Sequence, residues 1–216
     1  MKYRLLIVTS MSLVFVIGLC LSAFAQELKP IQLPEPRLDP SKSLVQALKD
    51  RKTTREYSGE LSEQVLSNLL WAAWGINRGD GRRTAPSAKN WQETDLYVAM
   101  KQGIYLYDAK KNTLEPKVSG DNCSLTYTQD RFKDAPIHLV FVADLDKMEG
   151  DEGIKMVLAG MDTGFIAENV YLYCASEGLP TGFRVSIDKP KLGAALKLKP
   201  NQRIMAAQSV GLPKSK

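Results

Sequence analysis

The sequence is poor in the residues that usually bind transition metals. Its 216 residues include one histidine, His138, and three cysteines, Cys20, Cys123 and Cys174. Zinc sites take most of their four ligands from these two residue types, so we expect no metal site. His138 falls in an apolar run, which predicts a packed position in the core. Cys123 and Cys174 could form a disulfide in an oxidising compartment, although Cys174 lies in a helix that is predicted to be buried.

The first 25 residues have the pattern of a secretory leader. Lys2 and Arg4 form a positively charged start, residues 5–21 are mostly apolar, and Ala23-Phe24-Ala25 is a cleavage site of the A-x-A type. We therefore expect an exported bacterial protein, periplasmic or secreted, without stable membrane insertion after cleavage. The segment has no Arg-Arg pair, which favours the general export route over the twin-arginine route.

Two other interpretations of this leader stay open. An uncleaved membrane anchor is one, although the apolar run is marginal in length for spanning a bilayer. Lipid attachment at Cys20 is the other, and it is weaker because Leu19 is bulkier than the residue that usually precedes a lipidated cysteine.

Cleavage after Ala25 leaves 216 − 25 = 191 residues, a length that suits one domain with a full core. The leader carries two cations and no acid, so its loss lowers the formal net charge from +5 to +3. This charge is too small to indicate nucleic-acid binding. The rest of the chain divides into an extended, proline-rich arm, residues 26–40, and a domain, residues 41–216.

Hydrophobic periodicity predicts helices and strands that interleave along the domain. Helices are expected at 41–50, between an N-cap at Ser62 and a left-handed cap at Gly75, at 158–177 and at 189–196. Strands are expected at 95–101, 104–107, 113–118, 135–143 and 203–210, and the apolar run 135–143 should be central in the sheet. The meander of the first three strands indicates an α+β fold: a central, mainly antiparallel sheet flanked by helices.

The connections carry further expectations. The helix 158–177 is apolar around most of its circumference, and we expect it to be buried all round. Residues 144–153 are expected to form an acidic loop and residues 179–184 a loop that contains glycine. Residues 120–134 are polar and give no assignment.

A basic stretch, Arg51-Lys52-Thr53-Thr54-Arg55-Glu56-Tyr57, is the first candidate for binding chemistry. It places three cations and two hydroxyl groups within five residues. Arginine offers a planar set of donors that suits a phosphate, and threonine hydroxyls can bond the remaining acceptor lone pairs. On this stretch alone a solvated helix end is the simpler interpretation, because runs of charge usually lie at the surface.

A second polar stretch, Pro86-Ser87-Ala88-Lys89-Asn90-Trp91-Gln92, follows a basic loop with two glycines. Its serine, asparagine and glutamine side chains could bind the polar edge of a ring. An ordinary turn is again the simpler interpretation when the stretch is taken by itself.

These stretches and two further segments resemble motifs of the FMN-dependent nitroreductase family, nearest its SagB-type dehydrogenase branch. Residues 51–57 are similar to the family's opening Arg-x-Ser/Thr-x-Arg/Lys motif, and residues 86–92 to its Pro-Ser-Ser/Ala-x-Asn-x-Gln motif. Residues 162–179 (DTGFIAENVYLYCASEGL) are similar to its central helix, and Val210-Gly211-Leu212-Pro213 to its closing Val-Gly-Tyr-Pro. Each motif is weak alone, but all four occur in the family's order between about residues 44 and 214.

The resemblance implies a nitroreductase-like fold that holds FMN at the interface of a homodimer. The basic stretch would contact the FMN phosphate and ribityl chain, and the second stretch would contact FMN across the dimer interface. Backbone amides at Thr181 and Gly182 would approach the flavin ring near N5. A C-terminal lysine, Lys214 or Lys216, would complete the phosphate site. The implied cofactor-binding residues are Arg51, Lys52, Thr53, Arg55, Pro86, Ser87, Ala88, Asn90, Thr181, Gly182, Arg184 and Lys214.

The implied activity is that of an oxidoreductase which moves two electrons as a hydride through FMN. The substrate would be a small organic molecule, such as a nitroaromatic, a quinone-like compound or a SagB-type dehydrogenation substrate. NAD(P)H is a candidate electron donor. No catalytic side chain is expected, because the flavin carries the chemistry.

Two features set this chain apart from the family. Gln92 is followed by Glu93-Thr94 where many nitroreductases have Pro-Trp, and this difference favours the SagB-type branch. Export is the second feature, because FMN and nicotinamides are mainly cytoplasmic. A non-catalytic protein that binds a flavin or another phosphate-bearing ligand on the same fold therefore stays open as the alternative.

Overall fold

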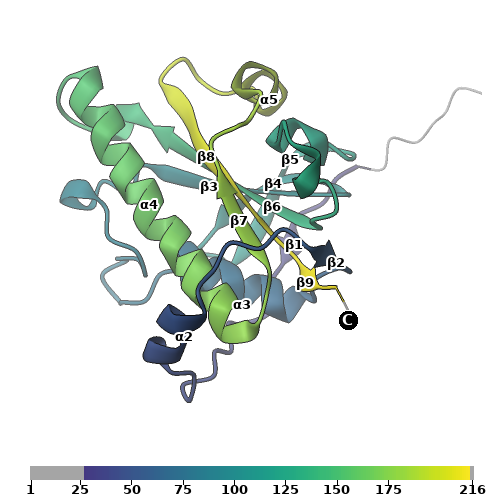
Figure 1. The fold of residues 1–216 in the computed structure, drawn as a ribbon. Helices are drawn as coiled ribbons and strands as arrows, with labels where there is room; N and C mark the ends of the chain where they lie inside the picture. The colour runs from purple at the N-terminus through teal and green to yellow at the C-terminus, as the bar shows by residue number, and fades with distance from the viewer. Residues whose placement is uncertain (1–26, 215–216) are drawn as a thin grey trace, which may run out of the picture.

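The computed structural model describes residues 27–214, and the predicted leader lies outside them (Figure 1). A large sheet is built from strands in the spatial order β1 (Ile31–Gln32), β5 (Thr113–Ser119), β4 (Gly103–Asp108), β3 (Thr94–Met100), β6 (Ile137–Asp144), β8 (Gln202–Val210) and β7 (Thr181–Arg184). Every neighbouring pair in it is antiparallel. The predicted α+β fold with one main antiparallel sheet is confirmed.

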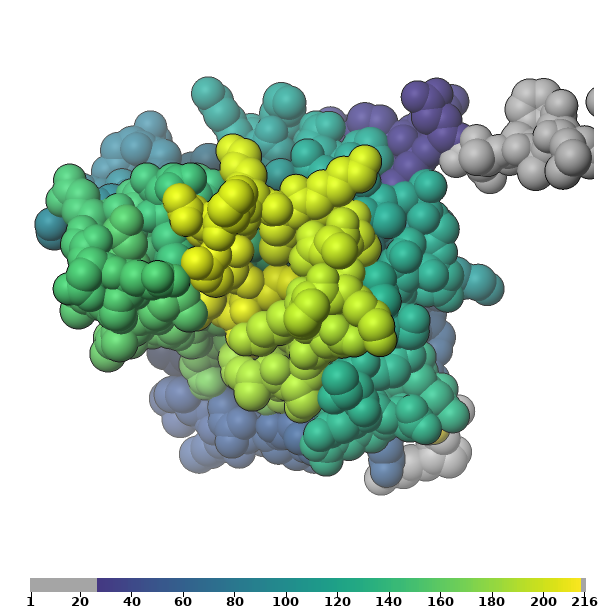
Figure 2. Space-filling model, turned by 90° about the horizontal axis from the view of Figure 1, so that it is seen from above, coloured from purple at the N-terminus to yellow at the C-terminus, as the bar shows by residue number. Residues whose placement is uncertain are grey.

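Helices cover both faces of this sheet. The α-helices are α2 (Leu44–Asp50), α3 (Glu63–Trp74), α4 (Glu152–Glu177) and α5 (Lys189–Leu196); short 3₁₀ helices are η1 (Ala88–Asn90), η2 (Cys123–Thr126), η3 (Asp130–Phe132) and η4 (Leu145–Lys147). Buried side chains of α3 and α4 pack on one face, and those of α5 with η2 on the other. Figure 2 shows α5 and the chain after it between the first turns of α4 and the region of η2 and η3. Within residues 27–214, no helix has the length and apolar character needed to cross a membrane.

Strand β6 lies near the middle of the sheet because both of its faces are apolar. All eight of its residues are buried. Leu139 and Phe141 pack against the α3 and α4 side, and Val140 and Val142 pack against the α5 side. This confirms the central strand that the apolar run predicts.

The long helix α4 differs from the prediction in two ways. It begins at Glu152, within the expected acidic loop, because the Asp151 side chain accepts a hydrogen bond from the Ile154 amide at 3.0 Å and caps the helix. The expectation that it is buried all round is wrong. Four apolar side chains form an exposed stripe along its first half, each between 44% and 55% exposed: Ile154, Val157, Met161 and Phe165.

The glycine caps of the two long helices are built differently. Gly178 ends α4 in the left-handed conformation, with φ of 69°. Gly75 ends α3 in an extended conformation, with φ of −72° and ψ of 163°, so its predicted left-handed cap is wrong. Gly75 lacks a side chain for another reason, because a Cβ there would lie 2.6 Å from the Trp71 carbonyl oxygen.

Two further segments correct or complete the predictions. Residues 181–184, expected in a loop, form strand β7 because they pair with the second half of β8. Residues 120–134 contain η2 and η3, joined by extended chain. The first helix starts later than expected, at Leu44, with Ser43 as its cap, and Leu44, Val45 and Leu48 are exposed.

Candidate functional site

The basic stretch is held against the end of α4 and strand β7. The Arg51 amide caps α2 by donating to the Ala47 carbonyl oxygen at 2.9 Å. The Thr54 amide then donates to the Thr181 carbonyl oxygen at 3.0 Å, and β2 (Tyr57–Ser58) pairs with β9 (Leu212–Pro213). Two segments at opposite ends of the domain thus come together with β7, which places the first and the closing motif side by side.

A cavity of about 650 Å³ lies between these segments. Four cations line it, Lys49, Arg51, Lys52 and Lys214, against two acids, Asp50 and Glu56. Within residues 27–214, neither Arg51 nor Lys52 forms an ion pair, and Lys214 reaches only Asp134 at 3.9 Å. Residues 178–181 also line the cavity. The cavity therefore offers positive charge that acidic side chains do not neutralise.

Tyr171 of α4 fixes one side of this stretch. Its hydroxyl accepts from the Phe183 amide at 3.0 Å, so its own proton is free to bond Thr53 Oγ1 at 2.9 Å. The Arg51 guanidinium lies over its ring, 5.5 Å from the centroid. Tyr171 thus links the basic stretch to β7.

Gly182 lies where side chains from three other segments approach the backbone of β7. A Cβ there would lie 3.1 Å from the Tyr57 hydroxyl oxygen and from Phe132 Cε1, and 3.5 Å from Arg55 Cγ. Two donors next to it, Arg55 Nε and the Tyr57 hydroxyl, are buried and have no hydrogen-bond partner among the described residues. Burial raises the pKa of Tyr57. The nearby charges of Arg184 and Arg55 lower this pKa but do not outweigh burial, so the phenol keeps its proton. Unbonded buried donors of this kind are uncommon and mark a place where a ligand can bond.

Arg184, a predicted cofactor contact, is not among the residues that line the cavity. Its side chain turns into the protein, where Nε donates to the Thr126 carbonyl oxygen at 2.9 Å and Nη1 to Ser209 Oγ at 2.7 Å. Nη2 lies 3.2 Å from His138 Nδ1, and the guanidinium stacks on Phe132 at 4.2 Å. Burial lowers its pKa to about 10, which leaves it charged at neutral pH. Arg184 therefore supports β7 from behind and does not line the cavity.

The second polar stretch forms a turn against the middle of α4. The Ala88 amide donates to Asp162 Oδ2 at 2.8 Å, and the Gln92 amide donates to Ser87 Oγ at 3.0 Å. Lys89, Asn90 and Gln92 all have left-handed backbone, with φ of 48°, 57° and 48°. Such a run without glycine is costly and recurs at binding sites. Lys89 and Asn90 point outward and are exposed, while Pro86 and Ala88 shape the turn.

One chain does not bring the two stretches together. The turn bonds α4 at Asp162, whereas the cavity borders α4 at Cys174, twelve residues later. At 1.5 Å per residue this corresponds to about 18 Å along the helix. The two stretches thus meet different parts of α4.

Sequence reasoning missed several residues of these sites. Tyr171 and Asp162 lie in the motif that resembles the central helix, and their polar groups in a largely apolar helix were the available signal. Glu93 is fully buried directly after the second stretch, and Tyr57 ends the first. Their unbonded atoms only become visible once the fold is known.

Comparison with known proteins agrees with this architecture. The antiparallel sheet, the long central helix and the cation-lined cavity define a nitroreductase-like protein. A model of the nitroreductase family matches residues 48–212. A candidate nitroreductase of Methanocaldococcus jannaschii is 32% identical over 165 residues, which cover 70% of this chain and 81% of that protein. This chain belongs to the nitroreductase family.

Solved structures show the same fold. A candidate nitroreductase of Ralstonia eutropha is 37% identical, with a TM-score of 0.82 over 88% of this chain and 91% of its own. A candidate nitroreductase of Desulfovibrio desulfuricans, solved in complex with FMN, is 19% identical, with a TM-score of 0.59 over 83% of this chain and 89% of its own. At that identity the second comparison speaks for the fold alone.

Proposed function

We propose that this protein is an FMN-dependent oxidoreductase that transfers a hydride to or from a small organic substrate. The observation that carries the proposal is the cation-lined cavity, together with two unbonded buried donors of the same basic stretch, Arg55 Nε and the Tyr57 hydroxyl. Phosphate suits the cations, and an electron-rich ring edge suits the donors. FMN carries both groups, and its flavin supplies the two-electron chemistry when bound.

The chain's own residues then have distinct tasks. Arg51, Lys52 and Lys214 would hold the phosphate, with Thr53 kept in place by Tyr171. Arg55 would donate to the ring side of the ligand, where positive charge favours the reduced, anionic flavin. The small Gly182 would let the β7 backbone approach the ring. These residues bind and orient the flavin, and no side-chain acid or base is required.

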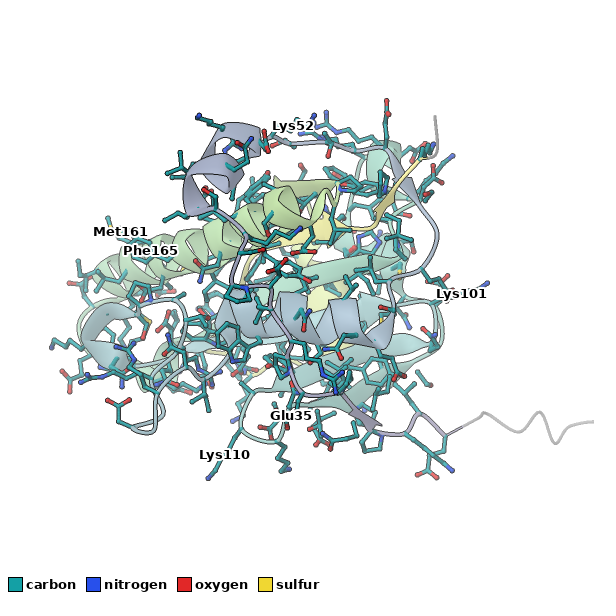
Figure 3. All side chains as sticks on the ribbon, turned by 90° about the horizontal axis from the view of Figure 1, so that it is seen from below. Glu35, Lys52, Lys101, Lys110, Met161 and Phe165 are labelled. Atoms are coloured by element: carbon teal, nitrogen blue, oxygen red, sulfur yellow. The ribbon has the colours of Figure 1, made fainter. Side chains whose placement is uncertain are left out.

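A homodimer is part of the proposal. The turn at Ser87 and Asn90 meets α4 about 18 Å along the helix from the cavity of its own chain. The exposed stripe that contains Met161 and Phe165 lies on the outer side of α4 (Figure 3). A contiguous apolar stripe on a soluble domain marks an interaction surface. A second copy that covers it would bring a partner turn toward the cavity.

The substrate, the branch and the compartment are also proposals. The residues Glu93-Thr94 after the second stretch support SagB-type dehydrogenation, and a nitroaromatic or quinone-like acceptor is the other class. NAD(P)H is the proposed electron donor. The pattern of residues 1–25 supports export, and the N-terminal residue of protein from a bacterial periplasm, found by mass spectrometry, would test cleavage after Ala25.

The experiment for the proposed function is an absorption spectrum of residues 26–216 after incubation with FMN and desalting. Retained bands near about 370 and 450 nm, bleached by NADH or by dithionite, are the expected result. Bleaching by dithionite alone would support the flavin enzyme with a different donor. A protein that retains no flavin would contradict the proposal and favour the binding of another phosphate-bearing ligand.

A further inference from the structure

Two acidic side chains meet in the core beneath the second polar stretch. Glu93 follows this stretch directly and is 0% exposed; Asp162 comes from α4 and is 2% exposed. The two carboxyl groups are neighbours: Glu93 Oε2 is buried without a hydrogen-bond partner among the described residues, and the negative charge of Asp162 helps to raise the pKa of Glu93. Asp162 Oδ2 also accepts from the Ala88 amide at 2.8 Å, and Glu93 Oε1 accepts from Thr94 Oγ1 at 3.3 Å. Two carboxylates bring only acceptors to such a contact, so a bond between them requires one proton.

The surroundings favour retention of that proton. Within residues 27–214, no lysine or arginine forms an ion pair with either acid. Arg83 bonds Gln92 and the Trp74 carbonyl oxygen, Lys147 pairs with Asp95, and the Asp144 amide bonds the Glu93 backbone. Burial raises the pKa of Glu93, and the neighbouring Asp162 raises it further; burial also raises the pKa of Asp162.

The turn above the pair depends on such anchoring. Lys89, Asn90 and Gln92 are left-handed, which costs about 1 to 3 kcal/mol for each such residue. The chain accepts this only where surrounding bonds over-determine the conformation. Asp162 is the one side chain of α4 that bonds the turn's backbone among the described residues. It lies next to Met161 of the exposed stripe, so α4 connects the proposed dimer face to the turn.

We propose that Asp162 is the positioning residue of the Pro86–Gln92 turn, and that a proton shared with Glu93 keeps it in place. The inference rests on the proposed function, because the turn's ligand is FMN there. With the proton present, one oxygen of Asp162 accepts a hydrogen bond from the protonated Glu93 carboxyl group, and the other accepts the hydrogen bond from the Ala88 amide. Without it, two adjacent negative charges repel, Asp162 leaves Ala88, and the turn loses its anchor. FMN binding should therefore weaken as the pH rises through the pKa of the pair.

The raised pKa of Glu93 also makes the stability of the fold depend on pH, in the same direction as FMN binding. Glu93 has a folded pKa above its unfolded value, so its contribution to stability is fully present below the unfolded pKa of about 4.3. That contribution declines as the pH rises above this value and is gone once the folded pair has lost its proton. Cofactor binding responds only in the last part of this window, when the folded pair itself ionises.

The test compares the wild type with Glu93→Gln, which supplies a permanent donor to Asp162. FMN dissociation constants, from quenching of flavin fluorescence, are measured between pH 6.5 and 9.5. We expect the wild-type constant to rise at least tenfold at the alkaline end and the E93Q constant to stay flat by comparison. Titration of FMN itself cancels between the two. Glu35→Gln, an exposed acid (Figure 3), should follow the wild type.

Asp162→Asn and Asp162→Ala test the anchor directly. Both should weaken FMN binding about tenfold or more across the whole range, and E93Q keeps the test decisive if neither folds. Parallel pH profiles in the wild type and E93Q would overturn this inference and leave the proposed function intact. A wild type that binds no FMN at any pH would overturn both. A thermal midpoint that responds to pH in the wild type but not in E93Q, with parallel FMN profiles, would assign the pair a structural role only.

Discussion

The Thr54 amide donates a hydrogen bond to the Thr181 carbonyl oxygen at a distance of 3.0 Å. This bond joins the basic stretch after α2 to strand β7, far away in the sequence. Because both groups belong to the backbone, the joint does not depend on the side chains of Arg51 and Arg55. Binding chemistry and local structure can therefore be separated by mutation.

The double variant Arg51→Ala and Arg55→Ala is expected to lose FMN and keep its fold. A hydrogen bond to a charged group contributes about 1.5 to 3 kcal/mol, so two lost contacts correspond to a dissociation constant raised at least roughly a hundredfold. The stacking of these arginines on Tyr171 and Phe132 contributes little to stability at this exposure. The flavin-to-protein ratio after desalting measures the effect.

The matched control removes two cations elsewhere. Lys101 and Lys110 lie away from Lys52 and the basic stretch (Figure 3), so Lys101→Ala with Lys110→Ala should keep the wild-type flavin content. Equal flavin content in the two double variants would refute the assignment of Arg51 and Arg55 to the phosphate and ring contacts. Circular dichroism of each variant checks that the fold persists.

The exposed stripe of α4 leads to a prediction about assembly. Met161→Asp with Phe165→Asp places two charges on a face that a second chain would bury, where an unpaired charge is strongly unfavourable. We expect the wild type to be a dimer and this variant a monomer in size-exclusion chromatography with light scattering. The variant should also bind FMN more weakly, since each site would lose the partner's turn.

Val185→Asp is the control for this prediction. Val185 is also an exposed apolar residue, 63% exposed, and it follows β7 instead of lying on α4. This variant should remain dimeric. A dimer that survives the α4 double variant, or dissociates equally with Val185→Asp, would show that the stripe is not the contact surface.

The regular part of the fold was predictable because local pattern and tertiary structure agree there. The run that became β6 is apolar on both faces, and α5 begins and ends at the predicted residues. The exposure of Phe165 was not predictable, because a side chain covered by the core and one that faces outward on α4 look the same in sequence. The strand character of residues 181–184 was hidden too, since it comes from pairing with β8 and not from local propensity.

The candidate site likewise contains residues that the sequence predicts and residues that only the fold reveals. The motif residues Arg51, Lys52, Thr181 and Lys214 line one cavity, as the resemblance implies. Arg184 is the last residue of β7, and only the folded structure shows that its side chain points into the protein. Glu93 and Asp162 are far apart in the chain and become neighbours only in the fold, so no spacing in the sequence indicates this pair.

Arg184 carries a prediction of its own, because it is a buried cation without an acidic partner among the described residues. Arg184→Met keeps much of the volume and leaves no opposite charge unpaired, so we expect a loss of about 1 to 3 kcal/mol from the unbonded Thr126 and Ser209. Arg184→Ala adds a cavity and should lose about 3 to 5 kcal/mol. Urea unfolding gives both values. FMN content of the methionine variant should match the wild type, and its loss would place the guanidinium in the cofactor site after all.

His138 allows a test of the core by pH, because it is the chain's single histidine. Burial lowers its pKa to about 3, and the nearby Arg184 lowers it further. Its Nδ1 lies 2.7 Å from Ser209 Oγ and accepts a hydrogen bond from Arg184 Nη2, so the ring stays neutral in the folded protein. The unfolded chain binds a proton near pH 6.5 and the folded chain does not. Stability from this residue is therefore present above pH 6.5 and declines as the pH falls toward 3.

The magnitude follows from that single proton. Well below pH 6.5 the free energy of unfolding should fall by about 1.4 kcal/mol for each pH unit on account of His138. His138→Asn keeps an acceptor for Arg184 and cannot titrate, so its stability should change less between pH 6 and 5. Urea unfolding at both pH values gives the two slopes. Most carboxyl groups are ionised in this interval, and their residual titration is common to both proteins. Equal slopes in the wild type and the variant would mean that the folded ring takes up a proton, which its contact with the Arg184 guanidinium should prevent.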